Sequence, residues 1–288
     1  MKYSSYNEFH LGDNLVVLHF LRKLAGAHPE HTFEHAVPGG DLEALREFVD
    51  LPAIQLAALP RPGAAVGRNL WKNAGEFWAS HPNREDHAAF TLAWYAKLAG
   101  DWGLPAPCQT PPDLLFDFPC LSWPNLKRHA HFDFLIINSQ PCSGQLRAYT
   151  TQDYLTPLIV ELAREGHRVA YTQPLFLDRE ATPAEAEVVA AARDRLLCTR
   201  AAHLTLAGIG RLSLRCALVM GVATGPLWPC LNIWNRTKPV CALLDHVLGP
   251  EDLTTLKPHC YQVETVAAMQ EWLRWWFSPA GLEQRLTP

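Results

Sequence analysis

Two stretches of alternating strand-like and helix-like segments, separated by a proline-rich segment, constrain most strongly how this chain can fold. Short apolar runs alternate with longer segments of helical periodicity before residue 101 and again after residue 131. Such alternation predicts strand–helix–strand crossovers, which produce parallel sheets covered by helices. The 288 residues suffice for two such units. We therefore expect an α/β protein of two Rossmann-like domains that face a cleft.

The proline-rich segment 101–131 holds the expected boundary between the two units. Its prolines break regular structure and are Pro105, Pro107, Pro111, Pro112, Pro119 and Pro124. We expect an N-terminal domain of residues 1–128 and a C-terminal domain of residues 129–288. A short strand is expected at 113–118. The last helix, 263–277, is expected to dock on the protein and to pack back on the N-terminal domain.

The expected elements alternate in both halves. In the first half they are helix 14–25, strand 32–38, helix 41–49, strand 54–59 and helix 87–98. In the second half they are strand 132–138, helix 151–165, strand 168–172, a helix to residue 197 that starts at the capping box Thr182–Glu185, strand 203–207, helix 212–220, strand 239–244 and helix 263–277. Ligands of parallel sheets bind at the carboxyl ends of strands. The loops of interest are therefore 10–14, 138–145, 172–178 and 208–213.

Composition excludes several classes of function. A formal net charge of −4 argues against non-specific nucleic-acid binding. The eight cysteines contain no C-x-x-C pair, the N-terminus does not read as a signal peptide, and no apolar run approaches ~20 residues. We expect a reduced, cytoplasmic protein. The 13 histidines lack the spacing of a metal site, so no metal is expected.

The pair Gly12-Asp13 stands just before the buried helix 14–25. Aspartate is among the best residues for capping a helix N-terminus, so Asp13 has an ordinary structural interpretation. The functional interpretation is a general base that takes a proton from an acceptor hydroxyl. From local sequence alone both interpretations stay open.

Two loops between strand-like and helix-like segments could hold an anion. The first, 138–145, offers small residues with Gln140 and Ser143 as donors, although an ordinary polar loop is an equal alternative. The second, 207–215, is predicted to form an anion cradle from a helix N-terminus, glycines and two arginines. Its candidate residues are Gly208, Gly210, Arg211, Ser213 and Arg215. It is neither a dinucleotide fingerprint nor a P-loop.

Aromatic residues mark two further segments. Trp228, in the long loop 221–230, could stack on a nucleotide or a sugar, or could simply be packed. The helix that ends at 272–277 carries aromatic residues on several faces. It has the features of an interfacial membrane anchor but lacks a lysine-rich face, which favours docking on the protein.

The order of these parts resembles the heptosyltransferase-like glycosyltransferases of glycosyltransferase family 9, which have the GT-B fold. In that family a Gly-Asp pair starts the first helix, as Gly12-Asp13 and residues 15–24 do here. Residues 87–104 are similar to the family's helix that ends in a Gly-Leu-Pro turn. Residues 134–166 are similar to the first strand, loop and helix of its donor domain, and residues 201–221 to its donor-binding glycine loop. That loop usually reads Asp-x-Gly-x-x-His, and Gly208 and Ser213 stand at its two ends.

The resemblance implies that a sugar moves from a nucleotide-sugar, which is a substrate rather than a cofactor, to an acceptor hydroxyl without a metal ion. Asp13 would be the base, and Arg211 or Arg215 would offset the charge of the leaving group. Donor contacts would come from Gly12, Gln140, Ser143, Gly208, Gly210, Arg211, Ser213 and Arg215. Residues 1–128 would then be the acceptor-side domain and residues 129–288 the nucleotide-sugar-binding domain, and closure of the cleft would bring the two together.

The implied acceptor is a glycan, a lipid-linked molecule or a protein, and peripheral membrane association is left open. Two alternatives stay beside this interpretation. One is a non-catalytic interaction module of the same fold in a glycan-assembly system, which the altered glycine loop motivates. The other is a nucleotide-sugar epimerase or hydrolase of similar fold.

Overall fold

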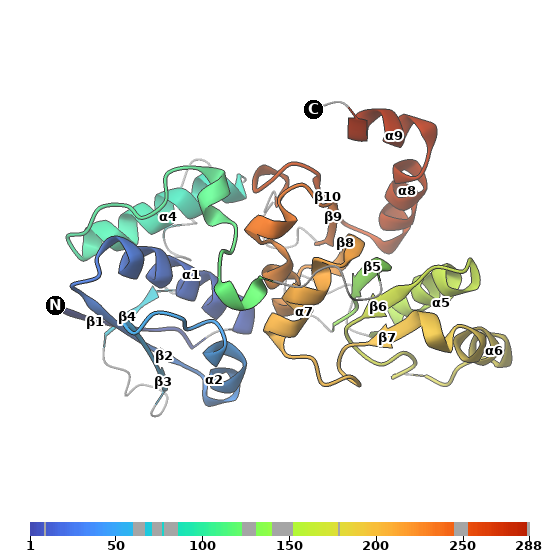
Figure 1. Ribbon diagram of the computed structural model, residues 1–288, viewed down its shortest axis with the longest axis horizontal. Coiled ribbons are helices and arrows are strands. Elements are labelled where there is room, and N and C mark those ends of the chain that lie inside the picture. The colour runs from blue at the N-terminus through green and yellow to red at the C-terminus, as the bar shows by residue number, and fades with distance from the viewer. Residues whose placement is uncertain are drawn as a thin grey trace.

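Two parallel sheets lie side by side in the computed structural model of the chain (Figure 1). The structure describes residues 1–8, 10–59, 67–70, 77, 86–122, 131–139, 152–177, 179–244 and 253–286. In the first sheet the order is β3 (Ile54–Ala58), β2 (Thr32–Val37), β1 (Lys2–Tyr6) and β4 (Arg68–Asn69). In the second it is β10 (Cys260–Val263), β9 (Val240–Leu243), β8 (Cys216–Val222), β5 (Phe132–Ile137), β6 (Val169–Tyr171) and β7 (Leu196–Cys198).

Helices connect these strands. The α-helices are α1 (Leu11–Ala27), α2 (Gly39–Arg46), α4 (His87–Asp101), α5 (Thr156–Arg164), α6 (Pro183–Ala191), α7 (Leu206–Ser213), α8 (Val266–Trp276) and α9 (Pro279–Leu286). Short 3₁₀ helices are η1 (Pro111–Leu114), η2 (Pro119–Leu121), η5 (Gln152–Leu155), η6 (Arg193–Arg195), η7 (Gly225–Cys230), η8 (Ile233–Asn235) and η9 (Leu253–Thr255).

The strand orders confirm the predicted fold class. In each sheet the strand order reverses once, although all strands are parallel. In the first sheet β2 and β3 lie to one side of β1 and β4 lies on the other. In the second sheet β6 and β7 lie to one side of β5, and β8, β9 and β10 lie on the other. This is the doubly wound arrangement of Rossmann-like units, and two of them form the GT-B architecture. The predicted boundary at residue 128 falls in 123–130, outside the described residues.

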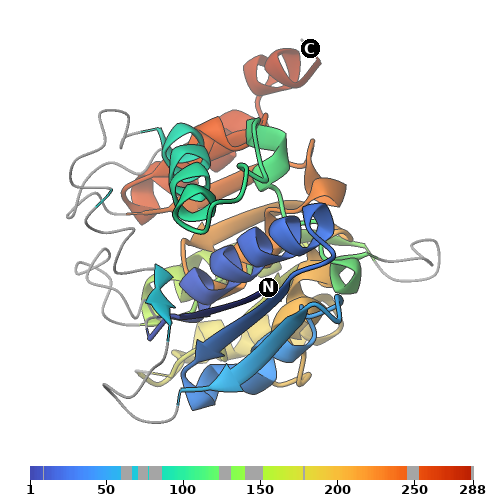
Figure 2. The ribbon, with the colours of Figure 1, turned by 90° about the vertical axis from the view of Figure 1, so that its left-hand side faces the viewer.

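The two sheets share one hydrophobic core. The first cluster of buried side chains runs from α1 and α4 across the junction to Leu135 and Ile137 of β5 and to Leu206 of α7. A second cluster covers the other face of the second sheet, where Trp272 and Trp276 of α8 pack on its strands. The prediction that the last helix packs back on the N-terminal domain is therefore wrong. Beyond α8, α9 extends away from both sheets (Figures 1 and 2).

One part of the predicted alternation is also wrong. The chain is helical from Leu206 and forms the central strand β8 from Cys216, where strand 203–207 and helix 212–220 were expected. Residues 216–222 are apolar almost throughout because both faces of a central parallel strand are covered, and such a run cannot be told from a buried helix by periodicity. The strand expected at 113–118 is replaced by η1 and a single bridge from Phe116 to Asn232.

Candidate active site

The second sheet reverses between β5 and β8, and ligands of such sheets bind outside the carboxyl ends of the strands at this point. The segment after β8 begins Ala223-Thr224-Gly225 and continues as η7. Gly221, near the end of β8, has a φ of +128°, and a side chain there would collide with the backbone of Ile137 in β5. The two strand ends therefore lie in direct contact at the expected ligand position.

Asn138 fixes the segment after β5. Its side-chain oxygen accepts hydrogen bonds from the backbone N–H groups of Thr172 at 2.9 Å and Gln173 at 2.8 Å, and its amide donates to the Gln173 carbonyl at 3.0 Å. Ser139 Oγ lies 2.9 Å from Thr172 Oγ1. The predicted donors Gln140 and Ser143 lie outside the described residues, so their role stays a prediction.

Asp13 lies at the corresponding reversal of the first sheet, where β1 is flanked by β2 and β4. Helix α1 begins at Leu11, three residues earlier than predicted, and its N-cap is His10. Asp13 is the third helical residue, and its Oδ2 accepts a hydrogen bond from the His10 backbone N–H at 3.3 Å. The carboxylate is half-buried. The N-cap interpretation of Asp13 is corrected to a capping box, which holds the carboxylate at the carboxyl edge of the sheet.

Trp228 brings the two reversal points together. A Cβ atom built on Gly12 would lie 2.7 Å from Cδ1 and 2.8 Å from Nε1 of Trp228, so only glycine fits beneath the indole. A Cβ atom built on Gly225 would lie 3.7 Å from the Gly12 nitrogen, so Gly225 also lies against this turn. The half-buried indole faces the His87 ring of α4, with 5.7 Å between ring centroids. The η7 segment of the second sheet thus covers the turn that carries Asp13.

A small, mostly apolar hollow of about 20 Å³, room for about one water molecule, lies beside this contact. Its walls include Trp228 and His87, together with Tyr95 of α4 and Val16 of α1. The proline-rich segment 101–122, called the linker below, adds residues 114–116 to the wall. Helices of the first half, the linker and the η7 segment thus meet at this point.

The predicted anion cradle at 207–215 loses its geometric basis. Gly208 and Gly210 lie inside α7, and the Gly208 N–H already donates to the N-cap hydroxyl of Thr205 at 3.1 Å. A Cβ atom on Gly210 would come within 2.9 Å of Pro229 Cβ, so this glycine allows α7 to pack on η7. A helix interior offers no free backbone N–H groups to a phosphate.

The polar residues of the same segment also have structural partners. Ser213 is buried; its hydroxyl donates to the Gly210 carbonyl and accepts from Asn235 Nδ2, both at 2.6 Å. Arg211 Nη1 donates to the Cys120 carbonyl at 2.8 Å and lies 3.8 Å from Glu47 Oε2, which ties α7 to the linker and to the first sheet's side. Arg215 is 2% exposed and precedes β8, at the amino ends of the strands, opposite the expected ligand edge.

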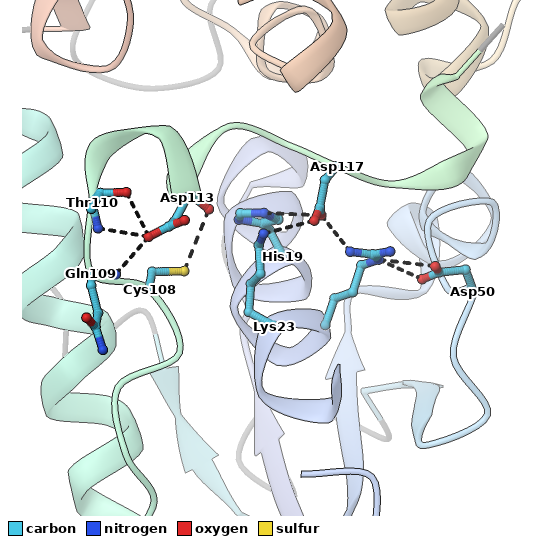
Figure 3. A network of polar contacts seen from close by, with 9 residues as sticks. His19, Lys23, Asp50, Cys108, Gln109, Thr110, Asp113 and Asp117 are labelled. Carbon is cyan, nitrogen blue, oxygen red and sulfur yellow. Dashed lines mark hydrogen bonds and ion pairs between the residues drawn. The ribbon is translucent and has the colours of Figure 1, made fainter. Parts of the chain in front are cut away.

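A network of charges anchors the linker on α1 (Figure 3). Asp117 lies 2.8 Å from Lys23 Nζ, 2.6 Å from Arg22 Nη1 and 3.6 Å from His19 Nε2. Arg22 Nε also bonds Asp50 at 3.0 Å. Burial acts to raise the pKa of Asp117, but His19 and Lys23 outweigh it and hold the pKa well below its usual range. Burial lowers the pKa of His19, which favours a neutral imidazole.

Among the residues that the structure describes, no group of three or more His, Cys, Asp or Glu side chains is arranged to hold a metal ion. None of the helices in the described ranges is long and apolar enough to span a bilayer.

Comparison with known proteins gives structural neighbours only. No protein-family model and no curated protein matches the sequence. The structure is similar to heptosyltransferase WaaC of E. coli with ADP, at 14% identity and a TM-score of 0.54 over 95% of this chain and 99% of that one. It is also similar to the same enzyme with ADP-2-deoxy-2-fluoro heptose, at 13% identity and a TM-score of 0.50 over the same shares. The glycosyltransferase family 9 structure from Veillonella parvula matches at 14% identity and a TM-score of 0.49, over 95% of this chain and 88% of that one.

The two WaaC structures, with TM-scores of 0.54 and 0.50, confirm the predicted two-domain GT-B fold. The spacing Asp-x-Gly-x-x-His of the resembled family can also be placed on 223–228, which directly follows the central strand β8. There, as at 208–213, only the glycine matches, because Ala223 and Trp228 stand at the Asp and His positions. The sequence signal that could have located this loop is the length of the apolar run before Ala-Thr-Gly: the 7 residues 216–222 are typical of a strand and short for a helix.

Proposed function

We propose that the protein is a glycosyltransferase that moves a sugar from a nucleotide-sugar to an acceptor hydroxyl, with Asp13 as the general base. The observation that carries this proposal is the juxtaposition of two reversal points, with the Asp13 carboxylate on one sheet and the Gly225 loop on the other. The whole-chain likeness to a heptosyltransferase solved with ADP and with an ADP-sugar analogue supports a nucleoside diphosphate sugar as donor.

The proposed reaction is a displacement at the anomeric carbon of the donor sugar. Asp13 takes the proton of the acceptor hydroxyl, whose oxygen forms the new bond to the anomeric carbon. The bond from that carbon to the diphosphate oxygen breaks, and the nucleoside diphosphate leaves with the electron pair. The donor diphosphate would lie at the carboxyl ends of β5 and β8, beside Gly225 and the segment after Asn138. The transfer is predicted to need no metal ion, and the class of acceptor stays a prediction.

Nucleotide binding and transfer test the proposal separately. ADP, UDP and GDP are titrated against the protein, and a bound nucleotide at 100 times its Kd should stabilise the fold by about 2.7 kcal/mol. ADP-sugars and UDP-sugars are then incubated with glycan acceptors, with and without EDTA. Asp13→Asn should lower transfer by about 100-fold or more while nucleotide binding and melting temperature stay near wild type. Wild-type transfer by Asp13→Asn would refute the role of the carboxylate.

A second candidate is a non-catalytic binding protein of the same fold. Two observations favour it: the Trp228 indole packs directly on Gly12, and Ala223 and Trp228 stand at the Asp and His positions of the resembled family's loop when that loop is placed on 223–228. This candidate predicts a ligand that binds equally well to wild type and to Asp13→Asn, with no turnover by either. Transfer by the wild-type protein that is lost in Asp13→Asn would exclude it.

A further inference from the structure

A chain of buried polar side chains runs beneath the turn that carries Asp13. It begins at Ser5 in β1, passes through His35 in the neighbouring strand β2 and reaches Asn14 in α1. Ser5 Oγ lies 3.0 Å from His35 Nδ1, and His35 Nε2 lies 3.3 Å from Asn14 Oδ1. Ser5 is 2% exposed and the other two side chains are fully buried. The three groups belong to different elements and meet only in the folded protein.

The contacts of Asn14 fix the direction of the hydrogen bonds. Its amide nitrogen donates to the His10 carbonyl at 3.3 Å, so its oxygen faces His35 and accepts. His35 therefore carries its proton on Nε2, and its Nδ1 at 3.0 Å is the nearer acceptor for the Ser5 hydroxyl, which also lies 3.3 Å from the Glu34 carbonyl oxygen. Burial lowers the pKa of His35 to about 3, so the imidazole stays neutral and keeps this tautomer near neutral pH. The side chain of Asn14 also hydrogen bonds Asp41 of α2.

The chain ends on the residue that caps the helix. The His10 carbonyl accepts both the backbone N–H of Asn14 at 3.1 Å and the Asn14 side-chain amide. The His10 N–H in turn donates to Asp13 Oδ2 at 3.3 Å. One residue, His10, thus links the buried amide to the carboxylate of the proposed base. Apolar side chains at positions 14 and 35 would fill the same space without the cost of burying polar groups, so the arrangement calls for a reason beyond packing.

We propose that His35 is a positioning residue for Asp13, which acts by orienting the Asn14 amide so that His10 and the capping box hold the carboxylate in place. This inference rests on the proposed role of Asp13 in sugar transfer. His35 itself touches no reacting atom in this scheme. Its contribution is to remove rotational freedom from the first turn of α1 before a ligand binds.

Two amide substitutions of His35 distinguish this positioning role from simple packing. The amide nitrogen of glutamine can replace the Nε2 donor of a histidine, whereas the shorter asparagine reaches only the Nδ1 position, where its side-chain oxygen can accept from Ser5 Oγ. His35→Gln therefore retains the bond to Asn14, and His35→Asn retains only the side facing Ser5. Both lose the imidazole ring and its packing. His19→Gln is the matched control, because His19 is also a fully buried histidine, lies on α1 itself and contacts Asp117 rather than Asn14.

Hydrogen exchange of the N-terminal turn of α1 (residues 10–17), measured by mass spectrometry, tests the proposal without turnover. In His35→Asn the exchange should be about five- to tenfold faster than in wild type, the effect of one lost buried hydrogen bond on a local opening. In His35→Gln and His19→Gln it should stay within about twofold. Residues 21–27, at the far end of α1, should exchange alike in wild type and both His35 variants. Equal acceleration in both His35 variants would overturn the proposal.

Kinetics add a second measurement if the protein transfers sugar. His35→Asn should lower kcat by about tenfold with little change in KM for the donor, and His35→Gln should restore most of kcat. Equal kcat in wild type and His35→Asn would refute the positioning role. Transfer by the wild type that persists in Asp13→Asn would refute the proposed base, whatever the exchange rates show. Exchange that follows the predicted pattern in a protein without transfer activity would contradict the proposed function and leave the positioning of the turn supported.

Discussion

Gly12→Ala tests the contact between the two halves most directly. The new methyl group would lie 2.7 Å from Trp228 Cδ1, about 1 Å inside the ~3.5–4.0 Å optimum for carbon atoms. Overpacking of this kind costs about 1–3 kcal/mol, and the alanine recovers at most about 1 kcal/mol of helix propensity. We therefore expect the free energy of unfolding to fall by about 1 kcal/mol, measured by urea denaturation at pH 7.

Gly26→Ala in the same helix is the matched control. A Cβ atom on Gly26 meets nothing within 4 Å, so this variant should be as stable as wild type or up to about 1 kcal/mol more stable. In a Trp228→Ala background the obstacle is gone, and Gly12→Ala should then stabilise rather than destabilise. The coupling energy of the double-mutant cycle should be about 2 kcal/mol. The reasoning is refuted if Gly12→Ala and Gly26→Ala have equal stability, or if the coupling is zero.

Two further perturbations address the buried histidine and the linker. Because burial lowers the pKa of His35 to about 3 in the folded protein, only the unfolded chain binds a proton at His35 between about pH 6.5 and 3. As the pH is lowered through this range, the free energy of unfolding of wild type should therefore decrease by about 1.4 kcal/mol per pH unit more than that of His35→Gln. Urea midpoints at pH 7 and pH 5 measure this, and parallel curves would contradict it. Asp117→Asn should cost about 2–3 kcal/mol at pH 7, since Lys23 and Arg22 lose their shared carboxylate. The loss should shrink progressively as pH falls below about 4, the ordinary pKa of the unfolded carboxyl, because the folded pKa of Asp117 is lowered and its contribution is lost only as pH falls through that lowered pKa. A pH-independent loss would argue against the ion pairs.

Local signals in the sequence predicted many elements well. The capping box at Thr182 forms as expected, with the Thr182 N–H donating to Glu185 Oε2 at 2.9 Å, and strands β5, β6 and β9 lie within or at the predicted ranges. These features depend on neighbours a few residues apart. The Gly12-Asp13 turn was recognised for the same reason, although its cap residue is His10.

The rest depended on long-range contacts that no local pattern shows. Whether 216–222 forms a helix or a strand is decided by β5 and β9 on its two sides. Because it forms a strand, the loop at the ligand edge is the segment after β8 and not the predicted loop 208–213. Arg215 was assigned to a phosphate by its charge, but the β8 register places it at the wrong end of the sheet. The link from His35 to Asn14 spans 21 residues and joins a strand to a helix, so only the fold reveals it.

The shared hydrophobic core has a consequence for the time course of ligand entry. Closure of an open cleft was expected, yet Leu135, Ile137 and Leu206 belong to the same apolar cluster as α1 and α4. Opening the two halves would expose that cluster to water, and domain openings take microseconds to milliseconds or longer. The half-buried Trp228 indole, in contrast, can move without separating the two sheets. Movement of this one side chain, rather than separation of the sheets, would therefore set how quickly a molecule reaches Asp13.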